Sequence, residues 1–316
     1  HIEIRRDGYV SYETQITPRS GIAQQVSVTL KTLRQAKLDS TKSVITTSVG
    51  QTLKLNYPFA FTMGASRREA GRRANETLRK INLTRAFYLG IKEVSNEEFQ
   101  AFDNGHSSGL VRGNSLDAPT QPVVNVTWEQ AAAFCNWLSE AESLRPFYLE
   151  EGGKIVGFDK KAIGYRLPTE AEWAWAARAN SRDSILKYPW GADSTPVKKN
   201  GNYADETASE LFARYLRGYD DGYLVSAPVG RFPSNLKGIH DLGGNVAEWV
   251  NDFYHIAVQG PNQVDVNPMG PESGDYHVIR GSSWAHGWKT ELRLSFRDYS
   301  AKPREDVGFR IARFLE

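Results

Sequence analysis

The feature that most constrains the fold is the lack of long periodic elements beyond about residue 180. From there to the C-terminus, Gly, Pro, Asn and Asp recur every few residues, and these residues favour turns over helices and strands. Upstream of this stretch, short helical patterns are interspersed with aromatic residues. Long irregular segments persist in a compact domain where they bind something or are themselves held in place. The sequence therefore predicts a loop-rich domain of mixed α and β structure.

Three helices are predicted by capping boxes at residues 95–98, 127–130 and 169–172. In each box a Ser or Thr is followed three positions later by Glu or Gln, and the two side chains cap free N–H groups of the first turn. Behind the second box, apolar side chains recur at helical spacing, namely Ala131, Phe134, Cys135 and Leu138. This spacing predicts a helix with one buried face.

Residues 1–33 alternate apolar and polar positions as β-strands do. Asp7-Gly8 marks a tight turn, residues 18–21 mark a second one, and residues 26–30 read as the last strand. This antiparallel unit is too small for a core of its own. It resembles the end of a PEGA domain, a β-rich surface module, in residues 8–10 and 26–30. Residues 34–57 are polar, and we interpret them as a connector to a domain over 58–316.

The bulk composition is that of a soluble globular chain. The net charge is only +2 over 316 residues, so we expect no nucleic-acid partner. No apolar run approaches the roughly 20 residues that a membrane-spanning helix needs, and the sequence does not open on a signal peptide. The chain begins at His1 without an initiator Met. We therefore expect an upstream segment, which could carry an export signal or an anchor.

Seven short motifs follow one another after residue 60. They are FTMG at 61–64, FYLG at 87–90 with EVSN at 93–96, PVVNVTW at 122–128, YRLPTEAEW at 165–173, GGNVAEW at 243–249, RGSSW at 280–284 and VGFR at 307–310. In this order they resemble the formylglycine-generating-enzyme, or sulfatase-modifying-factor, family. The resemblance implies an α+β fold, an irregular, loop-rich variant of the C-type lectin fold. That family includes copper oxidases, sulfur-transferring iron enzymes and non-catalytic binding proteins, so the fold alone does not decide function.

The cysteines that the family's copper oxidases need are missing from this chain. The resemblance implies that two thiolates follow the RGSSW motif and hold Cu(I), a soft metal. Residues 285–291 contain no cysteine, and the single Cys135 falls on the apolar face of a predicted helix. Such a cysteine is expected to be a small buried hydrophobe. We therefore predict no formylglycine-generating activity and no copper.

A histidine site for iron is the remaining catalytic alternative. The six histidines are His1, His106, His240, His255, His277 and His286. No two of them are three or four residues apart, and the His-x3-His-x-Glu spacing of the family's iron enzymes is absent. A non-heme metal-dependent oxidoreductase with an unrecognised His/carboxylate site stays open as the second hypothesis, and iron is expected only under it.

The family resemblance also implies two calcium sites, because two loop segments supply the oxygen ligands that calcium prefers. At the first site, Asn202 and Asp221 would give side-chain oxygens, while Tyr203 and Tyr223 would give backbone carbonyls.

At the second site, Asp241 and Glu248 would give carboxylates, and Gly244 and Val246 would give carbonyls. Asp241 stands where relatives often have Asn, which adds negative charge. Ordinary turns are the alternative interpretation of both segments, because Asn, Asp and Gly are common turn residues. We expect calcium, one or two ions, as a stabilising cofactor.

Arg166, Arg280 and Arg310 lie in family motifs, and each is expected to pair with a carboxylate or with loop carbonyls inside the domain. The resemblance places a substrate groove around five further residues, Trp284, His286, Trp288, Glu291 and Arg297. Aromatic rings beside a His, a Glu and an Arg can form a ligand-binding surface. A buried position is the alternative, above all for Trp284.

These observations favour a non-catalytic, calcium-stabilised binding or scaffold protein. Its lectin-like groove would face a protein, peptide or glycan, and the N-terminal β-unit would space the domain from a membrane or envelope. We expect a periplasmic or extracellular location in the bacterial envelope. A metal analysis separates the two hypotheses, since calcium alone favours a scaffold and iron or copper favours an enzyme.

Overall fold

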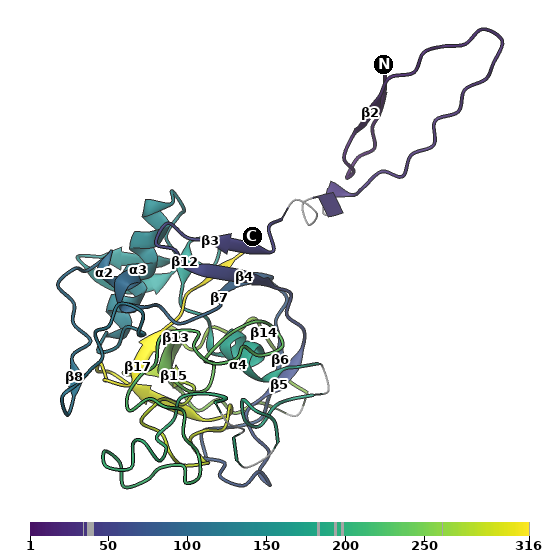
Figure 1. The fold of residues 1–316 in the computed structure, drawn as a ribbon. Helices are drawn as coiled ribbons and strands as arrows, with labels where there is room; N and C mark the ends of the chain where they lie inside the picture. The colour runs from purple at the N-terminus through teal and green to yellow at the C-terminus, as the bar shows by residue number, and fades with distance from the viewer. Residues whose placement is uncertain are drawn as a thin grey trace. The chain divides into compact units, whose positions relative to one another are not determined.

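The computed structural model describes residues 1–33, 35–36, 41–181, 184–192, 195–196, 199–260 and 262–315. By its internal contacts the chain divides into two units, His1–Ser43 and Val44–Glu316. Figure 1 traces the chain from the N-terminal unit, drawn in purple, to the C-terminal strands, drawn in yellow.

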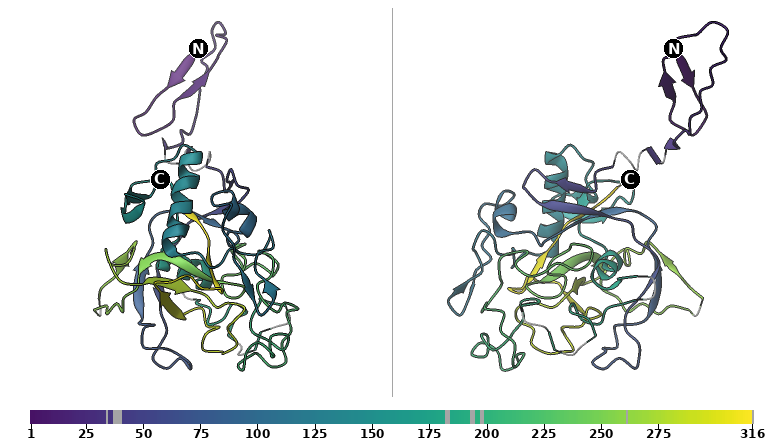
Figure 2. Two further views of the ribbon diagram at one scale, coloured as in Figure 1. Left: turned by 90° about the vertical axis from the view of Figure 1, so that its left-hand side faces the viewer. Right: turned by 45° about the vertical axis from the view of Figure 1, so that its right-hand side comes forward.

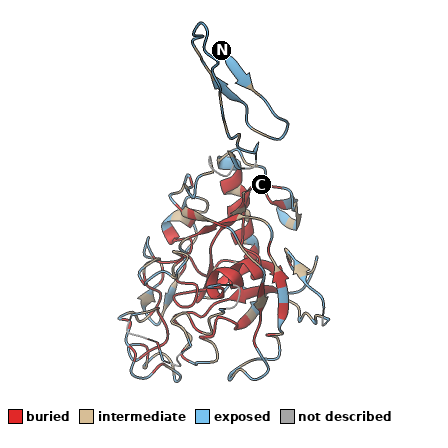
Figure 3. Cartoon of the chain, turned by 90° about the vertical axis from the view of Figure 1, so that its right-hand side faces the viewer, coloured by how far each residue is buried: buried red, intermediate tan, exposed pale blue. Residues whose placement is uncertain are grey.

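The N-terminal unit contains one antiparallel hairpin, β1 (Ile2–Ile4) with β2 (Tyr12–Thr14). Gly8, in the predicted turn, has a φ of 81°. The prediction of a strand at 26–30 is wrong, because the returning chain bridges Tyr9 through Thr32 instead. Residues 26–30 thus have no partner strand among the residues that the structure describes. Figure 3 shows most of this unit as exposed, as expected for a hairpin without a core.

The predicted connector is also wrong over its second half. Residues 44–56 form β3 (Val44–Thr46) and β4 (Thr52–Asn56), which pair with each other and join a sheet of the large unit. Leu53 is fully buried there. The alternation in the β4 sequence TLKLN was the signal for a half-buried strand. The large unit therefore begins near Val44 rather than at residue 58.

Two sheets organise the large unit. The five-stranded antiparallel sheet has the order β12-β18-β7-β4-β3, in which β12 is Tyr165–Arg166, β18 is Ala312–Phe314 and β7 is Phe87–Gly90. The four-stranded sheet has the order β16-β15-β13-β17, comprising Arg297–Ser300, His277–Arg280, Ala247–Phe253 and Val307–Phe309. The strand β17 runs parallel to β13, and the other pairs in this sheet are antiparallel.

Smaller β-elements flank these sheets. A three-stranded sheet combines β14 (Asp265–Val266), β6 (Arg79–Asn82) and β5 (Phe61–Met63). Two hairpins are formed by β10 (Tyr148–Glu151) with β11 (Lys154–Phe158), and by β8 (Leu110–Val111) with β9 (Asn114–Ser115). Between α4 and β13 the described residues form turns and bends without a named strand. Figure 2 shows these loops along one side of the large unit.

All three predicted capping boxes are present. They open α2 (Asn96–Gln100), α3 (Trp128–Ala141) and α4 (Glu170–Arg178), with Ser95, Thr127 and Thr169 as the N-cap residues. In each box the N-cap side chain accepts a hydrogen bond from the backbone N–H of the third helical residue, whose side chain in turn accepts one from the N-cap backbone N–H. The capping boxes therefore predicted these helix starts to the residue.

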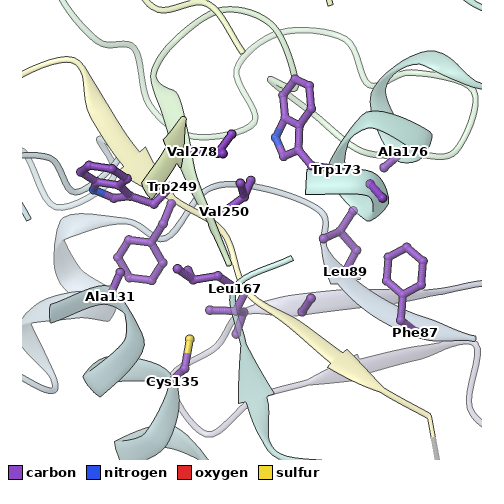
Figure 4. Packing of buried hydrophobic residues seen from close by; sticks show 14 of the residues in the cluster. Phe87, Leu89, Ala131, Cys135, Leu167, Trp173, Ala176, Trp249, Val250 and Val278 are labelled. Carbon is purple, nitrogen blue, oxygen red and sulfur yellow. The ribbon is translucent and has the colours of Figure 1, made fainter. Parts of the chain in front are cut away.

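The main hydrophobic core is enclosed by the two larger sheets together with the helices α3 and α4. Figure 4 shows Ala131 and Cys135 projecting from α3 toward Leu167, with Trp173 and Trp249 around Val250. Cys135 is fully buried, as predicted, and burial raises the pKa of its thiol. No helix among the described residues is long and apolar enough to cross a membrane.

Arginine–carboxylate pairs are buried in the same interior. Arg166 pairs with Glu172 at 2.6 Å, Arg310 pairs with Glu248 at 2.6 Å, and Arg280 lies 3.4 Å from Glu170. These contacts confirm the structural role predicted for the three motif arginines. Guanidinium groups suit such sites because their planar fork binds both carboxylate oxygens.

Candidate functional site

The structure brings the four residues of the first predicted calcium site into one loop cluster. The Asp221 carboxylate accepts hydrogen bonds from the backbone N–H groups of Tyr203 and Tyr223, both at 2.9 Å. The Asn202 amide donates to the carbonyl of Val225, whereas its side-chain oxygen Oδ1 is buried without a hydrogen-bond partner. A buried oxygen left unpaired is unfavourable unless something else binds it.

The two carboxylates of the second predicted site, Asp241 and Glu248, differ in their hydrogen bonding. Asp241, with a φ of 57°, accepts a hydrogen bond from the Gly230 N–H through Oδ2, and its Oδ1 is buried without a partner. Glu248 is fully engaged, because Oε1 accepts from Arg310 and Oε2 accepts from both Arg310 and Trp173. Asp241 Oδ1 is therefore available as a ligand oxygen, whereas both Glu248 carboxylate oxygens are already bound to Arg310.

Two further side chains connect the sites. The backbone carbonyl of Asn202 accepts from the Asn245 N–H at 2.9 Å. The Asn245 side chain in turn donates to Glu93 Oε1 at 3.1 Å, and Glu93 Oε2 is buried without a partner. Glu93, which follows β7, was missed as a site residue although it lies in the EVSN motif. A buried charged residue inside a motif was the signal that could have identified it.

The carboxylates of this region lack cations of their own. We call Glu93, Asp205, Asp221 and Asp241 the acidic cluster; all four are buried, and none forms an ion pair with a Lys or Arg among the described residues. Asp205 joins the cluster by accepting the Asp221 N–H at 2.6 Å. Uncompensated buried charge of this kind is costly, so a protein either protonates such groups or supplies a counterion.

The pKa values in the acidic cluster follow from this arrangement. Burial, and then the neighbouring Asp205, raise the pKa of Asp221 to about 7. Burial raises the pKa of Asp241 to about 6, and burial together with Asp241 raises the pKa of Glu93 well above its usual range. Each of these groups therefore ionises at a higher pH than an exposed carboxyl group does.

These donors fit calcium better than a transition metal. They combine carboxylate, amide and carbonyl oxygens, the hard ligands that calcium takes. Within the described part of the chain, no three His, Cys, Asp or Glu side chains converge as a metal-binding group. Each predicted calcium set contains at most two carboxylates and would be completed by amide and backbone carbonyl oxygens.

The five predicted groove residues do not all lie at the surface. Trp284 is fully buried and packs with Phe212, and Arg297 is buried with its guanidinium on Glu170. The groove prediction is wrong for these two residues, because both positions are enclosed by core contacts. His286, Trp288 and Glu291 remain at least partly exposed.

His286 is held in one tautomer by its neighbours. Its Nδ1 accepts a hydrogen bond from the Ser283 backbone N–H at 3.0 Å, so the neutral ring carries its proton on Nε2. A metal ligand needs a lone pair on the nitrogen that faces the metal, which Nε2 then lacks. The Ser283 hydroxyl is buried and bonds to Asp306 Oδ2 at 2.8 Å.

The fold and this site define a class, an α+β domain with acidic loops and without a thiolate pair. The family model of the sulfatase-modifying factor enzyme 1-like domain matches residues 46–315. The chain therefore belongs to the sulfatase-modifying-factor, or formylglycine-generating-enzyme, family, and its single cysteine shows that it lacks that family's catalytic pair.

Individual relatives differ in what they are called. A formylglycine-generating enzyme of Thermomonospora curvata is 33% identical over 54% of this chain and 48% of its own length. A serine/threonine-protein kinase, Pkn1 of Chlamydia trachomatis, is 28% identical over 72% of this chain and 33% of its own. The chain thus spans about half of the first relative and a third of the second. The solved structure of Treponema denticola variable protein 1 is 27% identical, with a TM-score of 0.62, over 85% of this chain and 98% of that one.

Proposed function

We propose that this protein is a non-catalytic binding or scaffold domain that calcium stabilises. The domain would be a variant of the C-type lectin fold, and it would present the surface around Trp288 to a partner in the bacterial envelope or outside the cell. The observation that carries the proposal is the acidic cluster, whose buried carboxylates form no ion pair with a Lys or Arg among the described residues. One or two calcium ions would supply the missing positive charge.

The family's oxidase chemistry finds no support in this chain. Copper binding in the oxidases requires two thiolates, and the single thiol of Cys135 is enclosed by the core on α3. The alternative of a histidine-based iron site gains no support from His286, because its neutral ring presents an N–H at Nε2 rather than a lone pair. We therefore favour binding over catalysis.

Metal analysis of the purified protein tests the proposal. The protein is purified without chelators, dialysed against metal-free buffer and analysed for calcium, iron and copper by inductively coupled plasma mass spectrometry. We expect calcium at about one to two equivalents and only traces of iron and copper. Iron or copper near one equivalent, without calcium, would overturn the proposal in favour of the oxidoreductase.

A second experiment addresses catalysis directly. The protein is incubated, with and without copper, with a sulfatase peptide that contains the target cysteine. We expect no formylglycine above the no-enzyme control, because no thiolate pair is present to hold the metal. An aldehyde product detected by peptide mass spectrometry would contradict the non-catalytic assignment.

A further inference from the structure

Three loops of the large unit pack against one another on its surface. They are residues 66–73, 212–217 and 286–291, which we call the basic surface. A Cβ atom at Gly287 would lie 2.5 Å from the Arg214 carbonyl oxygen, and one at Gly71 would lie 3.0 Å from Thr290 Oγ1. The loop of residues 286–291 therefore contacts both of the others. In Figure 1 the blue-violet and green loops gather at the side of the large unit away from β3 and β4.

Positive charge is concentrated on these loops. Their cationic residues are Arg67, Arg68, Arg72, Arg73, Arg214, Arg217 and Lys289. With Glu69 and Glu291 as the only carboxylates, the three loops carry a net charge of +5, against +2 for the whole chain. Both carboxylates already have cationic neighbours, since Glu69 accepts from Arg293 at 3.0 Å and Glu291 lies 3.8 Å from Arg73.

The basic surface also holds an exposed aromatic ring in a fixed position. The Arg214 guanidinium lies over the Trp288 ring, 3.7 Å from its centroid, and Trp288 remains 44% exposed. Stacking restricts the guanidinium while leaving its N–H edges free for hydrogen bonds. Arg73 is fixed in the same way over Phe296, at 4.5 Å. The surface thus presents oriented cations beside apolar area.

This composition favours a polypeptide over other anionic partners. Six of the seven cations are arginines, whose planar fork matches a carboxylate through two hydrogen bonds. Protein interfaces are enriched in Arg, Trp and Tyr, and depleted in Lys. Trp288 and the half-buried Tyr215 lie within these loops. A carboxylate-rich peptide chain would use both the charges and the rings.

We propose that the basic surface is the docking site for an acidic polypeptide segment, rich in Asp and Glu, from a partner protein. This inference rests on the proposed binding function and names the chemical class of its partner. The Arg214–Trp288 pair would be the centre of the contact, and Arg67 and Arg68 would steer the approaching segment at longer range.

Binding of a defined peptide tests the inference. The probe is a fluorescein-labelled Asp/Glu-rich peptide, measured by fluorescence anisotropy against its Asn/Gln counterpart of the same length. We expect the acidic peptide alone to bind, and its affinity to fall at least about tenfold between about 50 mM and about 300 mM NaCl because salt screens exposed charges. Equal binding of the two peptides, or no binding of either, would overturn the inference.

Matched variants localise the binding. Arg67→Ser/Arg68→Ser and Arg214→Ala/Trp288→Ala are each expected to weaken binding about three- to tenfold or more. The control is Lys160→Ser/Lys161→Ser, which removes two adjacent exposed cations from another loop and is expected to change affinity less than about twofold. Equal losses in the variants and the control would place the binding elsewhere and contradict the inference.

Two further measurements distinguish this inference from binding of a sulfated glycan and from the calcium proposal. Heparin is titrated as a sulfated glycan, and tighter binding of heparin with no binding of the peptide would reject a polypeptide partner. The thermal response to calcium is measured on the same preparations. If calcium raises the melting temperature but the peptide does not bind, only this inference is wrong. If the peptide binds but calcium leaves the melting temperature unchanged, the calcium proposal is wrong.

Discussion

The buried carboxylates of the large unit fall into two regions with opposite electrostatics. In the core between the sheets, Glu170 lies against Arg280 and Arg297, and Glu248 pairs with Arg310. In the acidic cluster, Asp221 and Asp241 are buried as well but have only backbone N–H donors in hydrogen-bond contact. The core carboxylates are neutralised by arginines, whereas those of the acidic cluster form no ion pair with a Lys or Arg among the described residues.

The pKa values of the two regions express this difference. Burial alone would raise the pKa of Glu170, but the neighbouring Arg297 and Arg280 lower it below its usual value. In the loops, burial raises the pKa of Asp221 to about 7 and of Asp241 to about 6. The comparison teaches that carboxylates in the same fold are structural where an arginine reaches them, and are candidate ion ligands where none does.

The largest effect is expected in the core. Glu170→Gln removes the only carboxylate that the described structure places on both Arg280 and Arg297. Two buried guanidinium groups would lose their partner, so the free energy of unfolding should fall by about 3–5 kcal/mol. Urea denaturation with calcium and with EGTA should give the same loss in both buffers. Exposed Glu272→Gln is the control, and a loss as small as in this control would contradict the structural role of Glu170.

In the acidic cluster, removing a carboxylate charge is expected to stabilise the protein in the absence of calcium, by less than the loss of Glu170 destabilises it. Asp241→Asn keeps an oxygen for the Gly230 N–H and removes a buried charge. In EGTA at pH 8 this variant should be more stable than the parent by about 1–3 kcal/mol, because a raised pKa reflects the cost of ionisation. In calcium the variant should lose that advantage. Destabilisation in EGTA equal to that in calcium would show that the Asp241 charge is already compensated.

The smallest expected difference between the core and the acidic cluster is in how the stability of the folded state changes with pH. A carboxyl group whose pKa is raised by folding stabilises the folded state below its unfolded pKa, and this contribution is lost as pH rises through the folded pKa. For Asp241 and Asp221 that window runs from about 4 to about 7. Glu170, with a lowered pKa, loses its contribution only as pH falls below its usual value.

Thermal melts over a pH series test this expectation. In EGTA, stability should fall between about pH 4 and about pH 7, and the rise in melting temperature on adding calcium should grow over the same interval. The Glu170 pairs should add no slope in this range. A calcium effect of equal size at pH 5 and pH 8 would contradict the assignment of the ion to these carboxylates.

Local sequence rules predicted some parts of this protein well. The capping boxes fixed the starts of α2, α3 and α4, since their hydrogen bonds involve residues three positions apart. The motif order predicted the family, which the match over residues 46–315 confirms. Strand β4 was missed because its short alternation was outweighed by the polar residues around it.

The site was harder to predict because it depends on contacts between distant segments. Glu93 and Asn245 are 152 positions apart, and their hydrogen bond ties Glu93 to the loop of the second predicted calcium site. The backbone N–H of the same Asn245 bonds to the Asn202 carbonyl and so joins that loop to the first site. Burial, which separates Trp284 and Arg297 from the exposed Trp288, likewise depends on the whole fold. The calcium ligands were predicted by family resemblance, whereas the engagement of Glu248 with Arg310 needed the structure.

The most direct test of the central claim is the melting temperature in EGTA and in calcium at pH 8. A ligand that binds only the folded state adds about 2.7 kcal/mol at a hundredfold excess over its dissociation constant. For a domain of this size, that corresponds to roughly 5 °C. We predict that EGTA lowers the melting temperature by this amount or more, that calcium restores it, and that Asp241→Ala blunts the response while Glu272→Gln does not. Melting curves that coincide in EGTA and calcium would show that the acidic cluster is not a calcium site.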